Sequence, residues 1–156
     1  MLEENPLEAL QARYARALDS KDLAGWAACF AREAGYSCIT RENVSQGLPI
    51  ALILDDSRGR IDDRVKIVSE VWAGTFEDYS TRHFVQNIHR EKSAPDAWAA
   101  QSNFIVAYTT ADGDSQVLAA GVYEDEMVLE SGRLVFRSRK AVLDTTYPPR
   151  YLVYPI

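Results

Sequence analysis

The chain contains 156 residues, of which 47% are hydrophobic and 26% charged, and its formal net charge is −6 at pH 7. A chain of this length is expected to form one domain, residues 1–156, and can bury about 70% of its extended surface. The negative charge disfavours binding to nucleic acid and to anionic membranes. The chain opens without a basic segment followed by an apolar one, and no stretch approaches the roughly 20 apolar residues of a membrane span. We therefore expect a cytoplasmic protein.

The N-terminal part carries two helical patterns. Asn5, Pro6 and Glu8 mark the start of the first helix: an N-cap residue, a proline at the first helical position, and a glutamate that can return a capping bond. Apolar side chains then recur at helical spacing on one face. After a break at residues 19–20, a second short helix is expected, with apolar residues at helical spacing from 23 to 30. The two helices should pack as a pair.

The next part of the chain combines several element types. Residues 36–40 suit a strand, and residues 41–49 suit a polar loop punctuated by glycine and proline. After the apolar run ALIL, a third helix is expected from about residue 57 to residue 72. Three helices should therefore precede the main sheet.

The second half of the chain changes to strand-like spacing. Four long segments rich in Val, Ile, Tyr, Phe and Thr are separated by short stretches of turn residues, and they cover residues 79–92, 97–110, 116–130 and 133–144. Four consecutive antiparallel strands are expected. Helices followed by a strand meander indicate an α+β fold in which the helices cover one face of a curved sheet.

Both histidines of the chain, His83 and His89, lie in the first of these strands. Six positions of extended chain separate them by about 20 Å, so they cannot share one metal ion. No cluster of His, Cys, Asp and Glu has the spacing of a zinc site, and no nucleophile or phosphate-binding motif is present. We therefore predict no metal site, no cofactor site and no catalytic residue.

A single catalytic histidine is the alternative. If His83 were buried and Asp19 or Tyr36 converged on it, the group could perform acid–base chemistry on a small ligand in the cavity of a cone-shaped domain, as a dehydratase or isomerase does. Otherwise His83 is a hydrogen-bonded structural residue or an interface residue. An open polar pocket at His83 would favour the catalytic interpretation. An interior filled by large side chains would favour a structural or interface role for His83.

The acidic residues show no pairing of the kind that catalysis requires. Around residues 55–64 aspartates and arginines alternate, which predicts ion pairs on a solvated helix face or between subunits. Residues 124–126, which read EDE, are interpreted as protecting a sheet edge or facing a basic partner. Cys29 and Cys38 form no C-x-x-C pattern and are expected to be reduced and buried.

The order and spacing of several segments resemble a known family. The stretches YARALDSKDLAGWAACF, GYSCITREN, QGLPIALILDDSRGRIDDRV, STRHFVQNI, AAGVYEDEMVL and LVFRSRKAVLD are similar to the small (beta) subunits of the aromatic-ring-hydroxylating oxygenases. The similarity extends from about Leu7 to residue 156. Three finer features, RENVSQGLPIALIL, GDS followed by AGVYED, and VYPI, most resemble the small subunits of salicylate 5-hydroxylase-type enzymes. Terephthalate, anthranilate and halobenzoate oxygenases look nearer than naphthalene or biphenyl oxygenases.

The resemblance implies a cone-shaped NTF2-like (SnoaL-like) fold, in which N-terminal helices pack on a strongly curved, mixed but mostly antiparallel sheet. It also implies a non-catalytic role, as the small subunit of a multicomponent Rieske non-haem iron oxygenase that acts on an aromatic, salicylate-like acid. Such subunits usually self-associate as a trimer and assemble with catalytic large (alpha) subunits as α3β3 hexamers, on which a ferredoxin and a reductase act.

The number of possible iron ligands agrees with this role. A Rieske [2Fe–2S] centre requires two cysteines and two histidines, and the mononuclear Fe(II) of these oxygenases requires two further histidines and a carboxylate. The chain has two histidines and two cysteines in all, so it cannot hold both centres. Both are expected in the large subunit.

The ending TTYPPRYLVYPI contains three prolines and three tyrosines and cannot continue a central strand. We expect residues 147–156 to form an extended tail whose aromatic side chains suit an interface. Contacts with neighbouring subunits are therefore predicted at seven positions on this tail and on the charged helix: Arg58, Arg60, Arg64, Tyr147, Tyr151, Tyr154 and Ile156.

Overall fold

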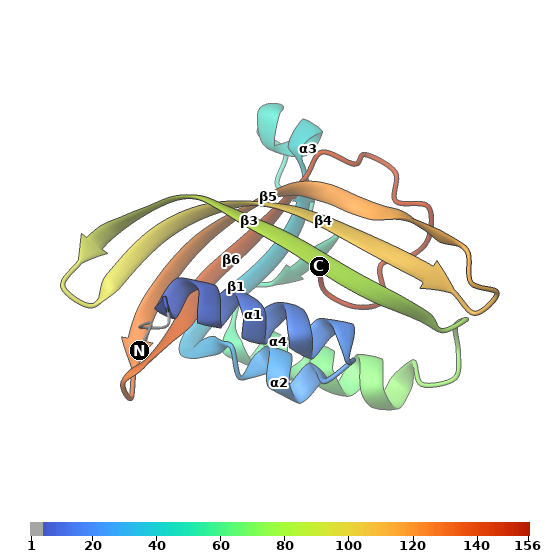
Figure 1. Cartoon of the computed structure of the whole chain (residues 1–156), viewed down its shortest axis with the longest axis horizontal. Coiled ribbons are helices and arrows are strands. Elements are labelled where there is room, and N and C mark those ends of the chain that lie inside the picture. The colour runs from blue at the N-terminus through green and yellow to red at the C-terminus, as the bar shows by residue number, and fades with distance from the viewer. Residues whose placement is uncertain (1–4) are drawn as a thin grey trace.

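Helices precede a long strand meander, as the sequence predicts. The computed structural model describes residues 5–156. Its elements in chain order are α1 (Pro6–Asp19), α2 (Leu23–Ala27), β1 (Phe30–Thr40), α3 (Arg41–Ser45), β2 (Ile53–Asp55), α4 (Arg58–Lys66), the π-helical turn η1 (Ile67–Val71), β3 (Tyr79–Ala94), β4 (Ala97–Thr110), β5 (Ser115–Glu130) and β6 (Arg133–Leu143). Helices α1, α2 and α4 lie together on one side of the sheet (Figure 1).

Within residues 5–156, six strands form one sheet in the order β2-β1-β6-β5-β4-β3. Strands β1 and β6 are parallel, and the other neighbouring pairs are antiparallel. The long strands curve around α1 (Figure 1), so the sheet has a concave inner face and a convex outer face. The expected α+β class, with a mixed but mostly antiparallel sheet, is confirmed.

Helix α1 begins where the sequence predicts. The Asn5 side chain accepts a hydrogen bond from the Leu7 N–H at 3.1 Å, which satisfies one of the free amide groups of the first helical turn. The buried face consists of Leu7, Leu10, Gln11, Tyr14, Ala17 and Leu18. Two members of this face, Gln11 and Tyr14, carry polar groups into the centre of the cone.

The start of β1 differs from the sequence prediction. Helix α2 ends at Ala27 and β1 already begins at Phe30, whereas a strand is expected only from residue 36. The intervening residues AREAG are small or charged and have little strand propensity. Pairing with β6 holds the two ends of this stretch, Phe30 opposite Phe136 and Gly35 opposite Ser138, and the register shifts between them.

Two further local differences lie in the connections. The expected polar loop contains the short helix α3, which is capped by the Thr40 side chain as it accepts a hydrogen bond from the Asn43 N–H. The expected third helix ends at Lys66 and continues as the π-helical turn η1. Neither a single turn of helix nor a change of helical hydrogen-bonding pattern alters the spacing of apolar residues enough to be predicted.

The core lies between the concave face of the sheet and helices α1, α2 and α4. Its largest fully buried side chains are Trp26, Arg139, Tyr14, Tyr36, Tyr123 and Phe136. Many of the aromatic rings meet edge to face, as Tyr14 and Phe136 do at 5.7 Å between centroids, an arrangement worth about 0.5–1.5 kcal/mol per pair beyond burial. Large aromatic side chains therefore fill much of the cone.

The two cysteines, Cys29 and Cys38, are free and buried, as expected. Burial raises the pKa of both thiols, and that of Cys38 to about 12. Neither thiol is therefore a thiolate nucleophile at neutral pH. No helix within residues 5–156 is long and apolar enough to cross a membrane.

The segment after β6, residues 144–156, contains no helix or strand. It first exposes Tyr147 and Tyr151 on the surface and then turns inward (Figure 1), so that Ile156 is only 1% exposed. The expected extended tail is thus a surface segment at its start and part of the interior at Ile156.

Candidate functional site

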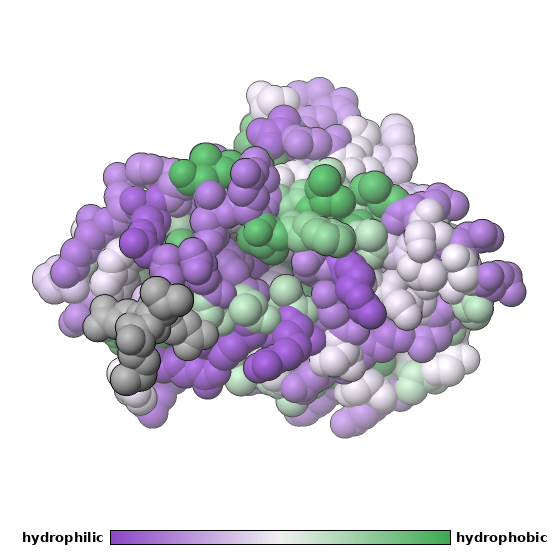
Figure 2. All heavy atoms as spheres, viewed as in Figure 1, coloured by the Kyte–Doolittle hydropathy of each residue, from purple (hydrophilic) through white to green (hydrophobic). Residues whose placement is uncertain are grey.

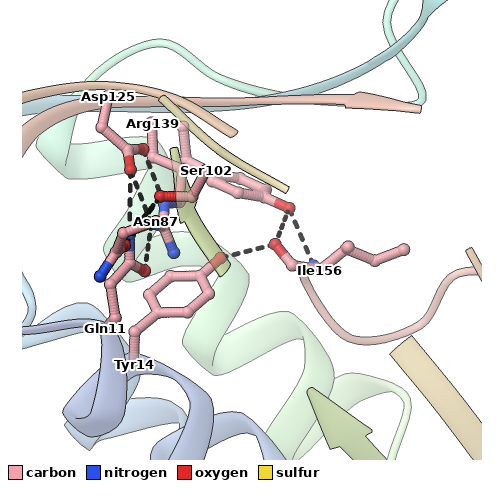
Figure 3. Close-up of polar contacts among 8 residues, drawn as sticks. Gln11, Tyr14, Asn87, Ser102, Asp125, Arg139 and Ile156 are labelled. Atoms are coloured by element: carbon pink, nitrogen blue, oxygen red, sulfur yellow. Dashed lines mark hydrogen bonds and ion pairs between the residues drawn. The ribbon is translucent and has the colours of Figure 1, made fainter. Parts of the chain in front are cut away.

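The centre of the cone holds a fully buried ion pair. Arg139 on β6 and Asp125 on β5 are joined by two hydrogen bonds, Nε to Oδ1 and Nη2 to Oδ2, each 2.8 Å long (Figure 3). Both side chains are 0% exposed. Arg139 Nη2 also donates to Gln11 Oε1 at 2.6 Å, which ties the pair to helix α1.

The ion pair belongs to a larger polar network (Figure 3). Gln11 Nε2 donates to Ser102 Oγ at 3.3 Å and to Asp125 Oδ2 at 3.4 Å. Ser102 Oγ in turn donates to Asn87 Oδ1 at 3.0 Å. The network therefore links α1 with strands β3 to β6, and it supplies partners for the buried carboxylate, which would otherwise be costly to desolvate.

Aromatic rings surround the Arg139 guanidinium. Its Cζ atom lies 4.2 Å from the ring centroid of Tyr14, 3.9 Å from that of Tyr123 and 4.0 Å from that of Phe136, so the cation interacts with the faces of the rings. Burial opposes the charge, but the carboxylate of Asp125 outweighs this effect and holds the pKa of Arg139 above its ordinary value. The Arg139 guanidinium is therefore held as a cation by the carboxylate with which it pairs, while its Nη1 has no hydrogen-bond partner among residues 5–156.

Two buried tyrosine hydroxyls next to this network are directed at the main chain of Ile156 (Figure 3). Tyr14 donates to the Ile156 carbonyl oxygen at 2.6 Å. Tyr36 donates to the same oxygen at 2.9 Å and accepts from the Ile156 N–H at 2.8 Å. Burial raises the pKa of Tyr14 to about 12 and that of Tyr36 well above its ordinary value, so both remain neutral hydrogen-bonding groups.

His83 is paired with Asp19, as the catalytic alternative requires. Its Nδ1 lies 2.6 Å from Asp19 Oδ1, and Asp19 also accepts from the His83 N–H and from the Thr81 hydroxyl. The His83 side chain is only 2% exposed, and its Nε2 has no hydrogen-bond partner among residues 5–156. The main surface cavities are lined by other residues, so the open polar pocket that a catalytic His83 needs is not found there.

Tyr36, the other partner that the catalytic alternative considers for His83, makes its hydrogen bonds elsewhere. The hydroxyl of Tyr36 is occupied by Ile156 and not by His83. The pair formed by His83 and Asp19 instead connects the end of α1 to the edge strand β3. Of the two residues that the alternative offers to His83, Asp19 is therefore its partner and Tyr36 is not.

The second histidine, His89, lies on the surface of β3. Its side chain is 63% exposed and its Nε2 is 3.8 Å from Glu91. No group of three or more His, Cys, Asp and Glu side chains within residues 5–156 could hold a metal ion. The geometry of the described chain thus offers no donor set for iron.

Residues 124–126 do not protect a sheet edge, and that interpretation is wrong. Strand β5 lies between β6 and β4 in the sheet, and Asp125 points into the core. The signal was present in the sequence: Tyr123, Asp125 and Met127 alternate and therefore share one face of a strand, and that face is buried. A carboxylate in this apolar row requires a buried cation, which is Arg139.

The three arginines predicted to contact neighbouring subunits make bonds within the chain. Arg58 binds Asp62 at 3.0 Å and two main-chain carbonyl oxygens between α2 and β1. Arg64 and Asp55 form a bidentate pair, and the Asp55 side chain is only 6% exposed, so this pair is not on a solvated face as expected. Arg60 alone of the three is mainly exposed, at 58% of its side chain.

The predicted contact residues of the tail differ in exposure. Tyr147 and Tyr151 are 88% and 91% exposed. Tyr154 packs edge to face against Tyr79 at 5.8 Å between centroids. Ile156 lies in the interior, so it contributes to the cone and not to an outer surface of the chain. A groove of about 900 Å³ is lined by the exposed tyrosines and other tail residues on one side and by Leu52 and residues 72–76, which follow η1, on the other.

Comparison with known proteins assigns the family. The sequence profile described as "Ring hydroxylating beta subunit" matches residues 13–149. The chain is 29% identical to the anthranilate 1,2-dioxygenase small subunit of Burkholderia cepacia over 94% of this chain and 90% of that protein. It is 26% identical to a terephthalate 1,2-dioxygenase terminal oxygenase component, subunit beta 2, of a Comamonas species, over the whole of both chains.

A solved structure agrees in fold. The beta subunit assigned to an aromatic-ring-hydroxylating dioxygenase of Novosphingobium aromaticivorans DSM 12444 superposes with a TM-score of 0.81, at 29% identity over 91% of this chain and 89% of that chain. The expected cone-shaped, NTF2-like fold is confirmed. The profile match covers most of the chain, and the chain therefore belongs to the ring hydroxylating beta subunit family.

Proposed function

We propose that this chain is the non-catalytic small subunit of an aromatic-ring-hydroxylating oxygenase and that its task is structural: it supports the assembly of catalytic large subunits. Family membership is the observation that carries the proposal. The filled interior supports it, because the charged pair Arg139 and Asp125 is fully desolvated and paired, where an enzyme of this shape would need a cavity with free polar groups.

In this proposal the redox chemistry belongs to the large subunit, which holds the Rieske centre and the mononuclear iron and receives electrons through a ferredoxin and a reductase. The chain has too few histidines for both centres. Of the two present, His83 is engaged by Asp19 and His89 stands on the surface.

We further propose that the complete enzyme acts on an aromatic acid of the salicylate type and forms an α3β3 hexamer in the cytoplasm. Two of the relatives act, by name, on anthranilate and terephthalate, which are benzoic acids with a second polar substituent, as salicylate is. The residues around the iron select the substrate, and those lie on the large subunit.

Subunit contacts are proposed at Tyr147 and Tyr151. Exposed tyrosines of this kind are enriched at protein interfaces because one large, rigid side chain supplies both apolar area and a hydrogen bond. Both line the groove between the tail and the segment that follows η1. The convex face of the sheet carries another apolar patch, for which no subunit contact is proposed: Phe84 and Ile105 pair across β3 and β4 and are 63% and 47% exposed. Figure 2 shows hydrophobic residues gathered over these strands.

Co-expression with a large subunit that carries the C-x-H and C-x-x-H spacing of a Rieske loop tests both the function and the contact surface. The wild-type chain should elute in one large complex on size-exclusion chromatography. The variant Tyr147→Ala/Tyr151→Ala should weaken assembly by about 30-fold or more, since truncation of an interface anchor costs roughly 2 kcal/mol.

The variant Phe84→Ala is the matched control, because it removes an exposed aromatic ring from the convex face instead of the tail. If the wild-type chain formed no complex, the proposed function would be contradicted. If the tyrosine variant assembled like the wild type, only the contact surface would be wrong.

A further inference from the structure

A pocket lies at the end of the molecule where α1 begins and where the β3–β4 and β5–β6 hairpins turn (Figure 1). Its volume is about 430 Å³, which is within the range of small-molecule sites. The apolar side chains that line it are Pro6, Leu7, Trp98, Met127, Leu129 and Leu134. Leu7 and Met127 are only 3% and 1% exposed, so the edge of the core forms the floor of the pocket.

Two cationic side chains stand at the rim of this pocket. Arg90 and Lys92 are two positions apart on β3, about 7 Å along the strand, and both line the pocket. Arg90 Nη1 donates to Asn5 Oδ1 at 2.9 Å, and Lys92 Nζ lies 5.7 Å from the centroid of the Trp98 ring. Neither cation forms an ion pair with a carboxylate among residues 5–156. The Lys92 ammonium and the other N–H groups of Arg90 are therefore available to a ligand.

The acidic residue that lines the pocket, Glu91, does not cancel this charge. It lies between Arg90 and Lys92 in the regular part of the ladder with β4, so its side chain points to the opposite face of the strand. The Glu91 side chain is 67% exposed, and its carboxylate is 3.8 Å from His89 Nε2. Two cations and one carboxylate leave a net charge of +1 at the rim. The rim therefore favours a ligand with a single negative charge.

The floor of the pocket determines which apolar group fits. Trp98 offers an aromatic ring on which a second ring can stack, and the thioether of Met127 makes favourable contacts with aromatic rings. Trp98 and Met127 lie opposite each other on β4 and β5, so one ligand ring can contact both. Lys92 lies opposite Trp98 on β3. A carboxylate attached to that ring can therefore reach the cations at the rim.

We propose that this pocket binds a small aromatic monocarboxylate, with its ring against Trp98 and Met127 and its carboxylate beside Arg90 and Lys92. Hydrogen bonds between charged partners are stronger than neutral ones, and a ring held in the pocket keeps the carboxylate within reach of both cations. All the lining residues belong to this chain. The proposal therefore goes beyond the proposed function, and it can be tested without a large subunit.

The test is a titration of the chain with 2-naphthoate, followed by the NMR signal of the Trp98 indole N–H. The anion should shift this signal and approach saturation below about 1 mM. 2-Naphthamide keeps the rings and lacks the charge, and it should bind about tenfold more weakly. Decahydro-2-naphthoate keeps the charge and lacks the aromatic rings, and it should bind roughly three- to tenfold more weakly.

The variant Arg90→Gln/Lys92→Gln removes two exposed cations and should weaken 2-naphthoate about tenfold or more, with little effect on 2-naphthamide. Arg32→Gln/Arg137→Gln is the matched control, because it removes the same charge from a different cleft, and it should bind 2-naphthoate like the wild type. No saturable shift with 2-naphthoate, or an equal loss of affinity in the two variants, would overturn the proposal. Equal affinity for 2-naphthamide or for decahydro-2-naphthoate would also overturn it, and would indicate an apolar docking surface or an unselective anion site instead.

Discussion

The Arg139 guanidinium and the Asp125 carboxylate are the two charges on which the interior of this protein depends. Their mutual attraction and their bonds to Gln11 offset the cost of removing both from water. Such pairs add little net stability compared with a well-packed apolar core, but the loss of one partner leaves an uncompensated buried charge. Substitution of one partner should therefore destabilise the fold strongly, whereas substitution of both partners should destabilise it less than the two single effects combined.

We expect Asp125→Ala to destabilise the fold by about 3–5 kcal/mol, because it leaves Arg139 buried without its carboxylate. Arg139→Met should have a similar effect on Asp125. The double variant should cost clearly less than the sum of the two single variants. Urea unfolding of the four proteins gives the coupling energy, and additive losses would show that the pair contributes nothing as a unit.

The pair of Asp19 and His83 has a local structural role in this account. Asp19 accepts from the Thr81 hydroxyl, from the His83 N–H and from His83 Nδ1. Burial opposes the ionisation of Asp19, but the hydrogen bonds and charge of His83 outweigh it, so the pKa of Asp19 lies below its ordinary value. The ionised carboxylate therefore fastens the end of α1 to β3.

Asp19→Ala should destabilise the protein by about 1–3 kcal/mol at neutral pH. Since the folded-state pKa is lowered, this contribution is present above the unfolded-state pKa of about 4 and is lost as the pH falls through the lower folded-state value. Urea unfolding at about pH 7 and about pH 3 should show the two proteins converging in acid. Asp78→Ala, which removes an exposed partner of Lys21, is the control and should change stability little.

At the scale of single residues, part of the site could be predicted and part could not. The alternation of Tyr123, Asp125 and Met127 marks Asp125 as buried once its strand is known to be central. Its partner Arg139 lies directly opposite Asp125 in the β5–β6 hairpin, but the register shifts between Glu126 and Met127, so counting from the turn does not give this pair. The inward turn of Ile156 belongs to a tail without periodic structure, which no spacing in the sequence predicts.

At the scale of elements, strands β5 and β6 approach each other unusually closely at Gly121. A Cβ atom built at Gly121 would lie 2.0 Å from the Val142 carbonyl oxygen, much closer than atoms can approach. Glycine is therefore required at this point of the β5–β6 ladder, where Gly121 faces Leu143.

Gly121→Ala should destabilise the protein by more than about 3 kcal/mol, because the added methyl group must push the two strands apart. Gly35→Ala is the matched control, since its Cβ would meet no heavy atom closer than 3.6 Å. Thermal unfolding followed by circular dichroism compares the two variants. Melting temperatures that agree within about 2 °C would contradict this explanation of Gly121.

The long elements were predictable because their apolar residues repeat with a clear period. The first helix and the four meander strands follow from that repeat, and the bounds of β4 are those expected, residues 97–110. The start of β1 was not predictable, because it depends on pairing with another strand of the sheet. The short helix α3 was not predictable, because it depends on a single capping residue. The spacing of apolar residues predicts elements that bury one face, whereas the start of β1 and helix α3 depend on contacts that leave no such spacing.

At the scale of the whole molecule, the chain combines a closed interior with an exposed aromatic tail. The closed interior leaves little room for a reaction, and the tail exposes Tyr147 and Tyr151, the proposed contact residues. Together with membership of the ring hydroxylating beta subunit family, this arrangement assigns the chain a supporting part in a larger enzyme. The histidine count suggests the same division of labour, and the aromatic residues of the tail already predict the contacts proposed at Tyr147 and Tyr151.

The most direct measurement is iron analysis combined with a hydroxylation assay on three samples: this chain alone, the large subunit alone, and the two co-purified. The account predicts that the chain alone contains no stoichiometric iron and hydroxylates no aromatic acid. Iron should accompany the large subunit, and the complex should be the stable and active form. Stoichiometric iron in the isolated chain, or turnover by the chain without a partner, would contradict the account.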